Sequence, residues 1–159
     1  MSVVTIIQEV KQVHLEYVVM TKVGKFYKVY GKDSYILSYL LNYKVKTEGR
    51  FITLGFPDAS LKKVQSVLES RKINYLILDS RTNYSIDEKQ EFNNLNKYKE
   101  VYEKSKTYVN NQTRINQIYD YLMSEAYDEK LKEKLAKIEE IISWKFKNRR
   151  IWLEKNLLS

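Results

Sequence analysis

The pattern of hydrophobic and polar positions divides the first half of the chain into short alternating elements. A helix is predicted first, at residues 5–14, with a strand as the alternative because several of these residues are valine or isoleucine. Runs of β-branched and aromatic residues then predict strands at 17–23, 26–30, 51–54 and 73–78. Two helices lie between them, one capped by Asp33 or Ser34 and one by Asp58 or Ser60. The resulting order, (α)ββαβαβ, predicts an α+β or mixed α/β fold in which helices pack on a small mixed sheet.

The second half of the chain has a helical pattern throughout. All four glycines and the single proline precede residue 60, so no helix breaker follows. The sequence from Ser85 to Glu88 fits a helical capping box. Apolar residues then recur at helical spacing from Tyr98 to Leu122 and again from Leu131, with a turn expected at 124–128. We therefore expect residues 1–80 to form the α/β domain and residues 85–159 to form a tail of antiparallel helices.

Composition excludes several classes of function. The chain has no cysteine and a single histidine, His14, so thiol chemistry and zinc sites built from Cys or His are not expected. No segment resembles a signal peptide or a membrane span, which predicts a cytoplasmic protein. No cofactor is expected. The formal net charge is +8, of which +5 (12 basic minus 7 acidic) falls in residues 1–80 and +3 (16 minus 13) in residues 81–159. A basic chain rich in tyrosine suits nucleic-acid binding, although an AT-rich genome produces the same composition.

Several of these basic residues lie in or next to the second predicted strand. With a period of two, Phe26, Lys28 and Tyr30 share one face. Tyr27 and Val29 share the other face and suit a core, so Phe26 would point outward among lysines. An exposed Phe can wedge between base steps while ammonium groups hold the phosphates. The alternative places Phe26 in the core and Tyr27 outside. The candidate nucleic-acid-binding residues of this half are Phe26, Lys22, Lys25, Lys28 and Lys32.

The stretch from Val23 to Ser34, VGKFYKVYGKDS, resembles the signature of the N-terminal mismatch-recognition domain of MutS proteins. Further on, Gly55-Phe56-Pro57 and the helix after it resemble that domain's Gly-Ile-Pro segment, and residues 73–78 match its next strand. The resemblance covers roughly residues 6 to 79 and implies a stand-alone MutS-like protein. In the family, the Phe of this motif stacks on a mispaired base and its Glu hydrogen-bonds that base.

The resemblance makes Phe26 the stacking residue, but the sequence departs from the family at neighbouring positions. Lys28 occupies the position of the Glu, and Lys25 that of an Asp. A lysine cannot accept a hydrogen bond from a base, so these changes favour phosphate attraction over mismatch selectivity. The family's later domains, including its ATPase, have no counterpart here, and no Gly-x-x-x-x-Gly-Lys phosphate loop is present.

Other candidate sites have structural interpretations. Asp33, Asp58 and Asp79 lie at element boundaries, where carboxylates can bind metals, but helix capping accounts for two of them. A second basic cluster could clamp a nucleic-acid backbone or could simply favour the end of a helix through its dipole. That cluster consists of Lys145, Lys147, Arg149 and Arg150.

Three functions follow from these observations. The first is a non-enzymatic accessory protein that holds mismatched DNA, distorted DNA or an RNA–DNA hybrid. By family analogy, such a protein would serve a DNA-repair machine or a reverse transcriptase, such as that of a diversity-generating retroelement, through the helical tail. The second is a protein–protein adapter that kept the fold without nucleic-acid binding. An enzyme is the least supported, because the sequence offers no nucleophile–base pair and no metal-ligand set.

Overall fold

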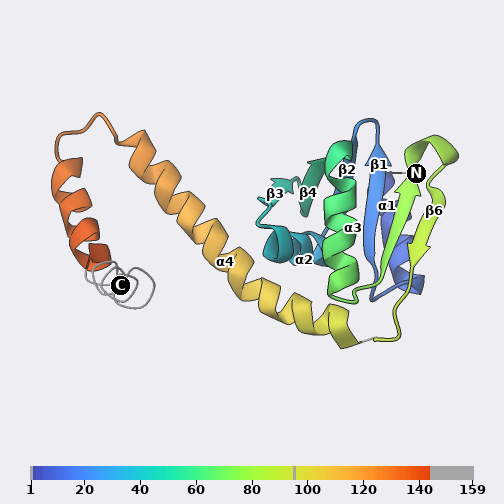
Figure 1. The fold of residues 1–159 in the computed structure, drawn as a ribbon. Coiled ribbons are helices and arrows are strands. Elements are labelled where there is room, and N and C mark those ends of the chain that lie inside the picture. The colour runs from blue at the N-terminus through green and yellow to red at the C-terminus, as the bar shows by residue number, and fades with distance from the viewer. Residues whose placement is uncertain (1, 95, 144–159) are drawn as a thin grey trace. The chain divides into compact units, whose positions relative to one another are not determined.

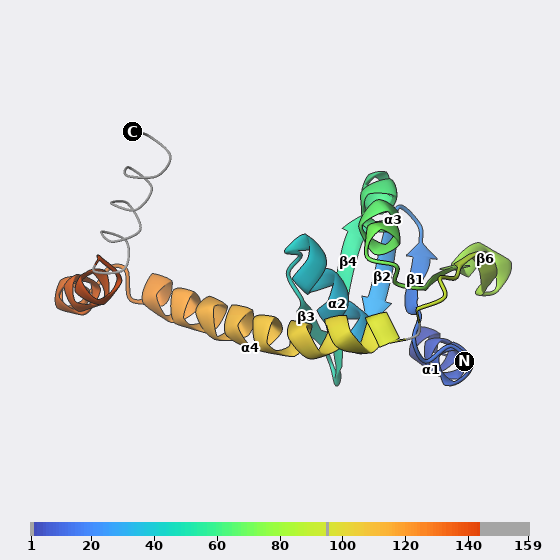
Figure 2. The ribbon, with the colours of Figure 1, turned by 60° about the horizontal axis from the view of Figure 1, so that its bottom comes forward.

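The computed structural model describes residues 2–94 and 96–143. The chain forms two compact units, Met1–Gln112 and Thr113–Ser159, and each is described by itself. The first unit contains a six-stranded mixed sheet with helices on both faces (Figures 1 and 2). This architecture confirms the predicted mixed α/β fold. Its strands are β1 (Val18–Val23), β2 (Phe26–Tyr30), β3 (Lys46–Glu48), β4 (Phe51–Pro57), β5 (Tyr75–Asp79) and β6 (Ser85–Gln90). Its helices are α1 (Val3–Val13), α2 (Lys32–Leu41), α3 (Leu61–Ser70) and the first part of α4 (Asn96–Ser124), with short 3₁₀ turns η1 (Asp58–Ser60) and η2 (Ser80–Thr82).

The strands are arranged in the order β3-β4-β2-β1-β5-β6. Strands β1 and β5 run parallel and are joined by a long connection, from β2 to α3, and every other pair is antiparallel. Strand β2 therefore lies inside the sheet, between β1 and β4, with Val23 opposite Phe26 at the hairpin end. This hairpin and its neighbour β4 carry the candidate site.

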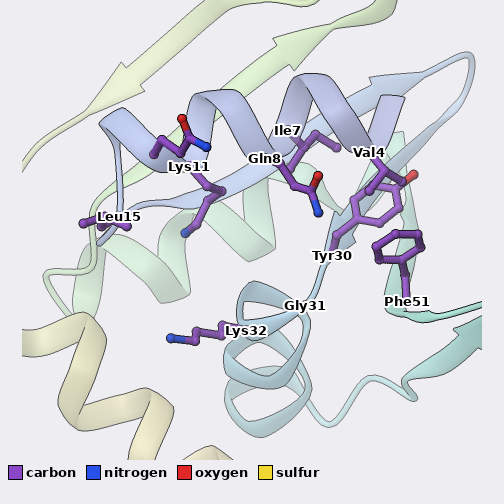
Figure 3. A pocket seen from close by; sticks show the side chains of 10 residues that line it. Val4, Ile7, Gln8, Lys11, Leu15, Tyr30, Gly31, Lys32 and Phe51 are labelled. Atoms are coloured by element: carbon purple, nitrogen blue, oxygen red, sulfur yellow. The ribbon is translucent and has the colours of Figure 1, made fainter. Parts of the chain in front are cut away.

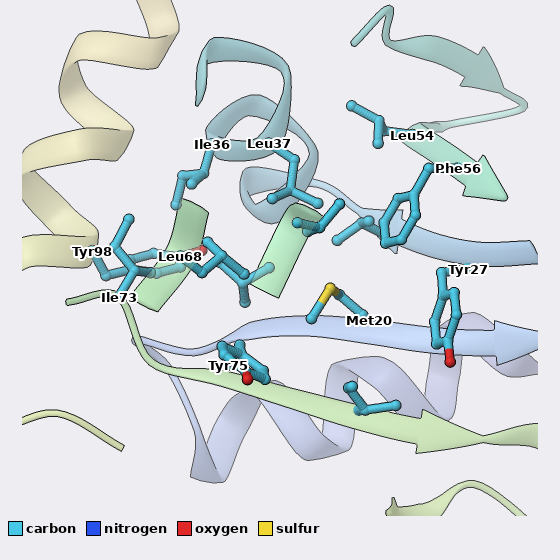
Figure 4. Packing of buried hydrophobic residues seen from close by; sticks show 14 of the residues in the cluster. Met20, Tyr27, Ile36, Leu37, Leu54, Phe56, Leu68, Ile73, Tyr75 and Tyr98 are labelled. Atoms are coloured by element: carbon cyan, nitrogen blue, oxygen red, sulfur yellow. The ribbon is translucent and has the colours of Figure 1, made fainter. Parts of the chain in front are cut away.

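Alternation along the strands divides the apolar side chains between two faces. One face, formed by residues such as Met20, Tyr27 and Leu54, packs against α2, α3 and the start of α4 (Figure 4). The other face carries Val19, Leu76 and Leu78 under α1. Figures 1 and 2 show α1 and α3 on opposite sides of the sheet. Helix α1 packs over β1 and β5 on this face, whereas Phe26 of β2 and Gly55 and Pro57 of β4 are exposed there.

Strand β6 differs from the sequence prediction. The helical capping box expected at Ser85–Glu88 is wrong, because these residues pair antiparallel with β5. The six residues of β6 are all polar except Ile86, and most are exposed. Backbone pairing with the edge of a buried strand, rather than an alternating side-chain pattern, holds them in place. How the chain divides into independently folding domains stays a prediction.

Asp33 and Asp58 are not the helix caps that the sequence predicted. Gly31 takes the cap position of α2 and Ser60, the alternative candidate, takes that of α3, but no side chain makes a capping hydrogen bond at either helix. The buried Asp33 carboxylate instead accepts hydrogen bonds from Lys11 Nζ at 2.9 Å, from the Val19 amide at 3.0 Å and from the Tyr98 hydroxyl. Burial and the neighbouring Asp33 carboxylate raise the pKa of Tyr98, so its hydroxyl stays protonated as the donor.

The second half of the chain is helical from Asn96, as the lack of helix breakers predicts. Helix α4 runs for 29 residues to Ser124, and another helix follows at 131–143. The turn between them confirms the one expected at 124–128. The start of α4 packs into the core of the first unit through Tyr98 and Val101. The antiparallel packing of the two helices stays a prediction.

Candidate nucleic-acid interface

A tight turn of two residues, Gly24 and Lys25, joins β1 to β2. Gly24 adopts a φ of +62°, a conformation that the two-residue turn requires and that glycine adopts without strain. Lys25 follows, and its carbonyl accepts a hydrogen bond of 2.9 Å from the Asp58 amide at the start of η1. This bond ties the hairpin tip to the end of β4, while the Lys25 side chain remains exposed.

Phe26 points away from the core, as the alternation predicted. Phe26 is 57% exposed, whereas the neighbouring Tyr27 is only 3% exposed. The Tyr27 ring stacks on that of Phe56, with ring centroids 5.4 Å apart. Burial, followed by the charge of Asp58, raises the pKa of Tyr27 to about 12, so its phenol is neutral. The alternative with Phe26 in the core is therefore wrong. A large aromatic ring stands open beside the hairpin turn.

Two of the predicted lysines already have carboxylate neighbours. Lys28 Nζ lies 3.1 Å from Glu48 on β3, and Lys22 Nζ lies 3.7 Å from Asp58. Both carboxylates are about half exposed. Exposed ion pairs of this kind contribute at most about 1 kcal/mol, so a phosphate can compete for either lysine. Lys25 and Lys28 thus lie near Phe26, whereas Lys22 pairs with Tyr27 across the hairpin and lies on the opposite face of the sheet, with its Nζ 5.7 Å from the centre of the Tyr27 ring.

The remaining predicted residues do not join this group. Lys32 opens α2, and its Nζ lies 5.2 Å from the centre of the Tyr102 ring on α4. Lys145, Lys147, Arg149 and Arg150 lie outside the described residues.

The structure adds a feature that was not predicted from the sequence. A hollow of about 220 Å³ lies beside Phe26, over strands β2, β4 and β3. Gly55 pairs with Lys28 across the β2–β4 ladder, and its missing side chain leaves this part of the sheet face uncovered. The β3–β4 hairpin brings further lysines to the hollow. Its lining includes Phe26, Lys28, Lys44, Lys46, Glu48 and Gly55.

Lys44 and Lys46 alternate along the chain before Glu48, and this alternation is the signal that could have revealed them. Their approach to Phe26 depends on the pairing of Lys46 with Thr53 across the β3–β4 hairpin. Strand β3 was absent from the predicted elements because its three residues are polar and exposed.

The carboxylates considered for metal or acid–base chemistry are paired elsewhere. The Arg81 side chain and amide both bond Asp79 and lower the pKa of that carboxyl to about 2. Asp33 is held in its buried network and Asp58 lies beside Lys22. Within residues 2–94 and 96–143, no three His, Cys, Asp or Glu side chains gather as metal ligands would. Over the same residues, no helix combines the length and apolar character that crossing a membrane requires.

Comparison with known proteins identifies the family of the sheet domain. No curated protein matches the sequence. The family model of MutS domain I matches residues 3–93, which include the whole sheet and more than half of the 159-residue chain. Domain I is a non-catalytic DNA-binding domain that recognises mismatches. The chain therefore belongs to the MutS domain I family.

Proposed function

We propose that this protein is a non-enzymatic accessory factor that holds mismatched or otherwise distorted DNA, or an RNA–DNA hybrid, with Phe26 stacked at the defect. The observation that carries the proposal is the exposure of Phe26 beside a hollow lined with lysines. The ring supplies the stacking surface, and the hollow gives room for a displaced base.

The magnitudes favour a substrate that is already distorted. Base–aromatic stacking contributes about 1–3 kcal/mol, whereas unstacking one step of intact duplex costs a few kcal/mol. One phenylalanine therefore cannot kink perfect duplex favourably without many phosphate contacts. A mismatch, nick or junction has lost part of its stacking in advance, so the same ring binds there with a net gain.

Lys28 affects which distorted DNA the protein would prefer. An ammonium group has three donors and no acceptor, so it binds phosphate or a base acceptor. Its pairing with Glu48 at 3.1 Å keeps it beside the hollow until a phosphate arrives. We therefore expect selection by the ease of unstacking, rather than by the hydrogen-bonding edge of a particular base.

Fluorescence anisotropy with matched duplex, mismatched duplex and RNA–DNA hybrid, each over a range of salt concentrations, tests the proposal. If Lys25, Lys28, Lys44 and Lys46 all contact phosphates, the log–log salt slope should be about −3 to −4 for duplex. Lys46→Gln should reduce its magnitude by about 1 and weaken all duplexes alike. Equal affinity for matched and mismatched duplex, or no binding at low salt, would contradict the proposal.

Exposed apolar side chains in the described helices of the second unit favour a second role for the protein, as a protein-binding adapter. Several apolar side chains there are exposed among the described residues: Ile115, Ile118, Met123 and Ile141. Such side chains suit a partner protein, for which a reverse transcriptase is the specific candidate. The double variant Ile115→Glu/Ile118→Glu should abolish co-purification with a co-expressed retroelement reverse transcriptase and leave DNA binding unchanged. Unchanged co-purification would contradict the adapter role.

A further inference from the structure

A second and larger hollow lies at the other end of β2, between α1 and the ends of β2 and β4 (Figure 3). Its volume of about 560 Å³ falls within the range of small-ligand sites. Apolar and polar residues both line it, as in small-ligand sites generally. The lining includes Val4, Ile7, Gln8, Tyr30, Lys32 and Phe51.

Two aromatic rings, those of Tyr30 and Phe51, lie next to each other in this hollow (Figure 3). Phe51 is 39% exposed and Tyr30 is half-buried. Burial raises the pKa of Tyr30, so its phenol is neutral and presents an uncharged ring. Gln8 extends from α1 toward the same rings (Figure 3), and its amide can both donate and accept hydrogen bonds. The hollow thus combines a stacking surface with a group able to contact a base edge.

The two hollows lie along one strand face. Phe26, Lys28 and Tyr30 alternate outward on β2, opposite Pro57, Gly55 and Thr53 of β4. At about 3.3 Å per residue, Phe26 and Tyr30 lie roughly 13 Å apart, with Lys28 between them on the strand. Two aromatic residues with a lysine between them therefore offer two stacking surfaces and a phosphate contact along one strand.

Charge makes this face complementary to a polyanion. The Lys11 ammonium group is paired with Asp33 and contributes no excess charge. Four other lysines and a single carboxylate, that of Glu48, line the two hollows. These lysines are Lys28, Lys32, Lys44 and Lys46.

We propose that the face of β2 and β4 that carries Phe26, Lys28 and Tyr30 binds an unpaired nucleic-acid strand, with one base on Phe26 and another base further along the strand on Tyr30 and Phe51. Sheets that present two or three aromatic rings in this way hold about two or three nucleotides. The strand runs along β2, and its phosphates lie against Lys28 and the neighbouring lysines. This inference shares Phe26 with the proposed function and so rests on it in part, whereas Phe51 is specific to the single strand.

The test uses the full chain and labelled oligo(dT) and oligo(rU) of about ten nucleotides, a length within the range of single-strand site sizes. Phe51→Leu keeps an apolar side chain against α1 but removes the ring. It should weaken oligonucleotide binding at least about fivefold, the lower end of the effect of losing one base–aromatic stack. It should also leave the affinity for mismatched duplex within about twofold, because Phe26 is intact. The matched control is Tyr127→Leu, which removes an exposed ring from the other unit and should change nothing.

The outcomes separate the two proposals. Binding of either oligonucleotide that is lost in Phe51→Leu supports the inference, and the ratio of the two affinities identifies DNA or RNA as the preferred strand. Oligonucleotide binding that Phe51→Leu leaves intact overturns it, as does the absence of any binding at low salt. Phe26→Ala assayed on mismatched duplex decides the proposed function independently. A fluorescent adenine analogue in the oligonucleotide gives a second readout, since its quenching on binding should disappear in Phe51→Leu.

Discussion

Replacing Tyr98 with phenylalanine tests whether the buried Asp33 network fixes the start of α4 on the sheet domain. The substitution keeps the ring in the core and removes only the hydroxyl that donates to Asp33. Hydrogen bonds to charged groups contribute about 1.5–3 kcal/mol. The carboxylate keeps Lys11 at 2.9 Å and the Val19 amide at 3.0 Å, so it is not left unpaired. We therefore expect a loss of about 2 kcal/mol in the free energy of unfolding.

The assay is denaturant unfolding followed by circular dichroism, with the thermal midpoint as a second measure. A loss of about 2 kcal/mol corresponds to a fall of roughly 5–10 °C for a unit of this size. Tyr119→Phe is the control, because Tyr119 is exposed on the same helix, and it should change the free energy by less than about 0.5 kcal/mol. If Tyr98→Phe changes stability no more than Tyr119→Phe, the network does not hold α4 and the reasoning is refuted.

Two further predictions concern the hollow beside Phe26 and the end of β5. A Cβ at Gly55 would meet only the Tyr27 carbonyl oxygen, at an ordinary 3.6 Å, and valine suits a strand better than glycine. Gly55→Val should therefore leave the melting temperature unchanged or raise it while weakening binding to mismatched DNA about tenfold; unchanged binding would show that the hollow is not used. The lowered pKa of Asp79, about 2, means that the folded state favours the carboxylate. The stabilisation by Arg81 should be complete above the ordinary aspartate pKa of about 4 and be lost as the pH falls toward 2. Arg81→Ala should raise the Asp79 pKa seen by carboxyl NMR; an unchanged value would contradict this assignment.

Much of the fold could be predicted because its signals are local. The alternation at Phe26 and Tyr27 is a property of a single strand, and it gave the correct inward and outward faces. The glycine at position 24 and the lack of breakers after residue 60 are equally local. These signals produced the hairpin, the order of the central elements and the two C-terminal helices.

The missed features depend on contacts between distant residues. Strands β3 and β6 are polar and exposed, so only pairing with β4 and β5 makes them strands. Asp33 has the residue type and position of a helix cap, but Lys11 and Tyr98 reach it from α1 and α4. Likewise, Lys46 and Phe51 meet the Phe26 face only through the register of the β2–β4–β3 ladders.

The central claim is that Phe26 recognises distorted DNA by stacking, and the affinity of Phe26→Ala for mismatched and matched duplex tests it most directly. The affinity for mismatched duplex should fall by roughly 5- to 150-fold and the preference over matched duplex should largely disappear. Because Phe26 is 57% exposed, the variant should lose about 1 kcal/mol of stability or less, against roughly 3–5 kcal/mol for Phe56→Ala in the core. An unchanged preference for mismatched DNA in the folded Phe26→Ala protein would contradict the account.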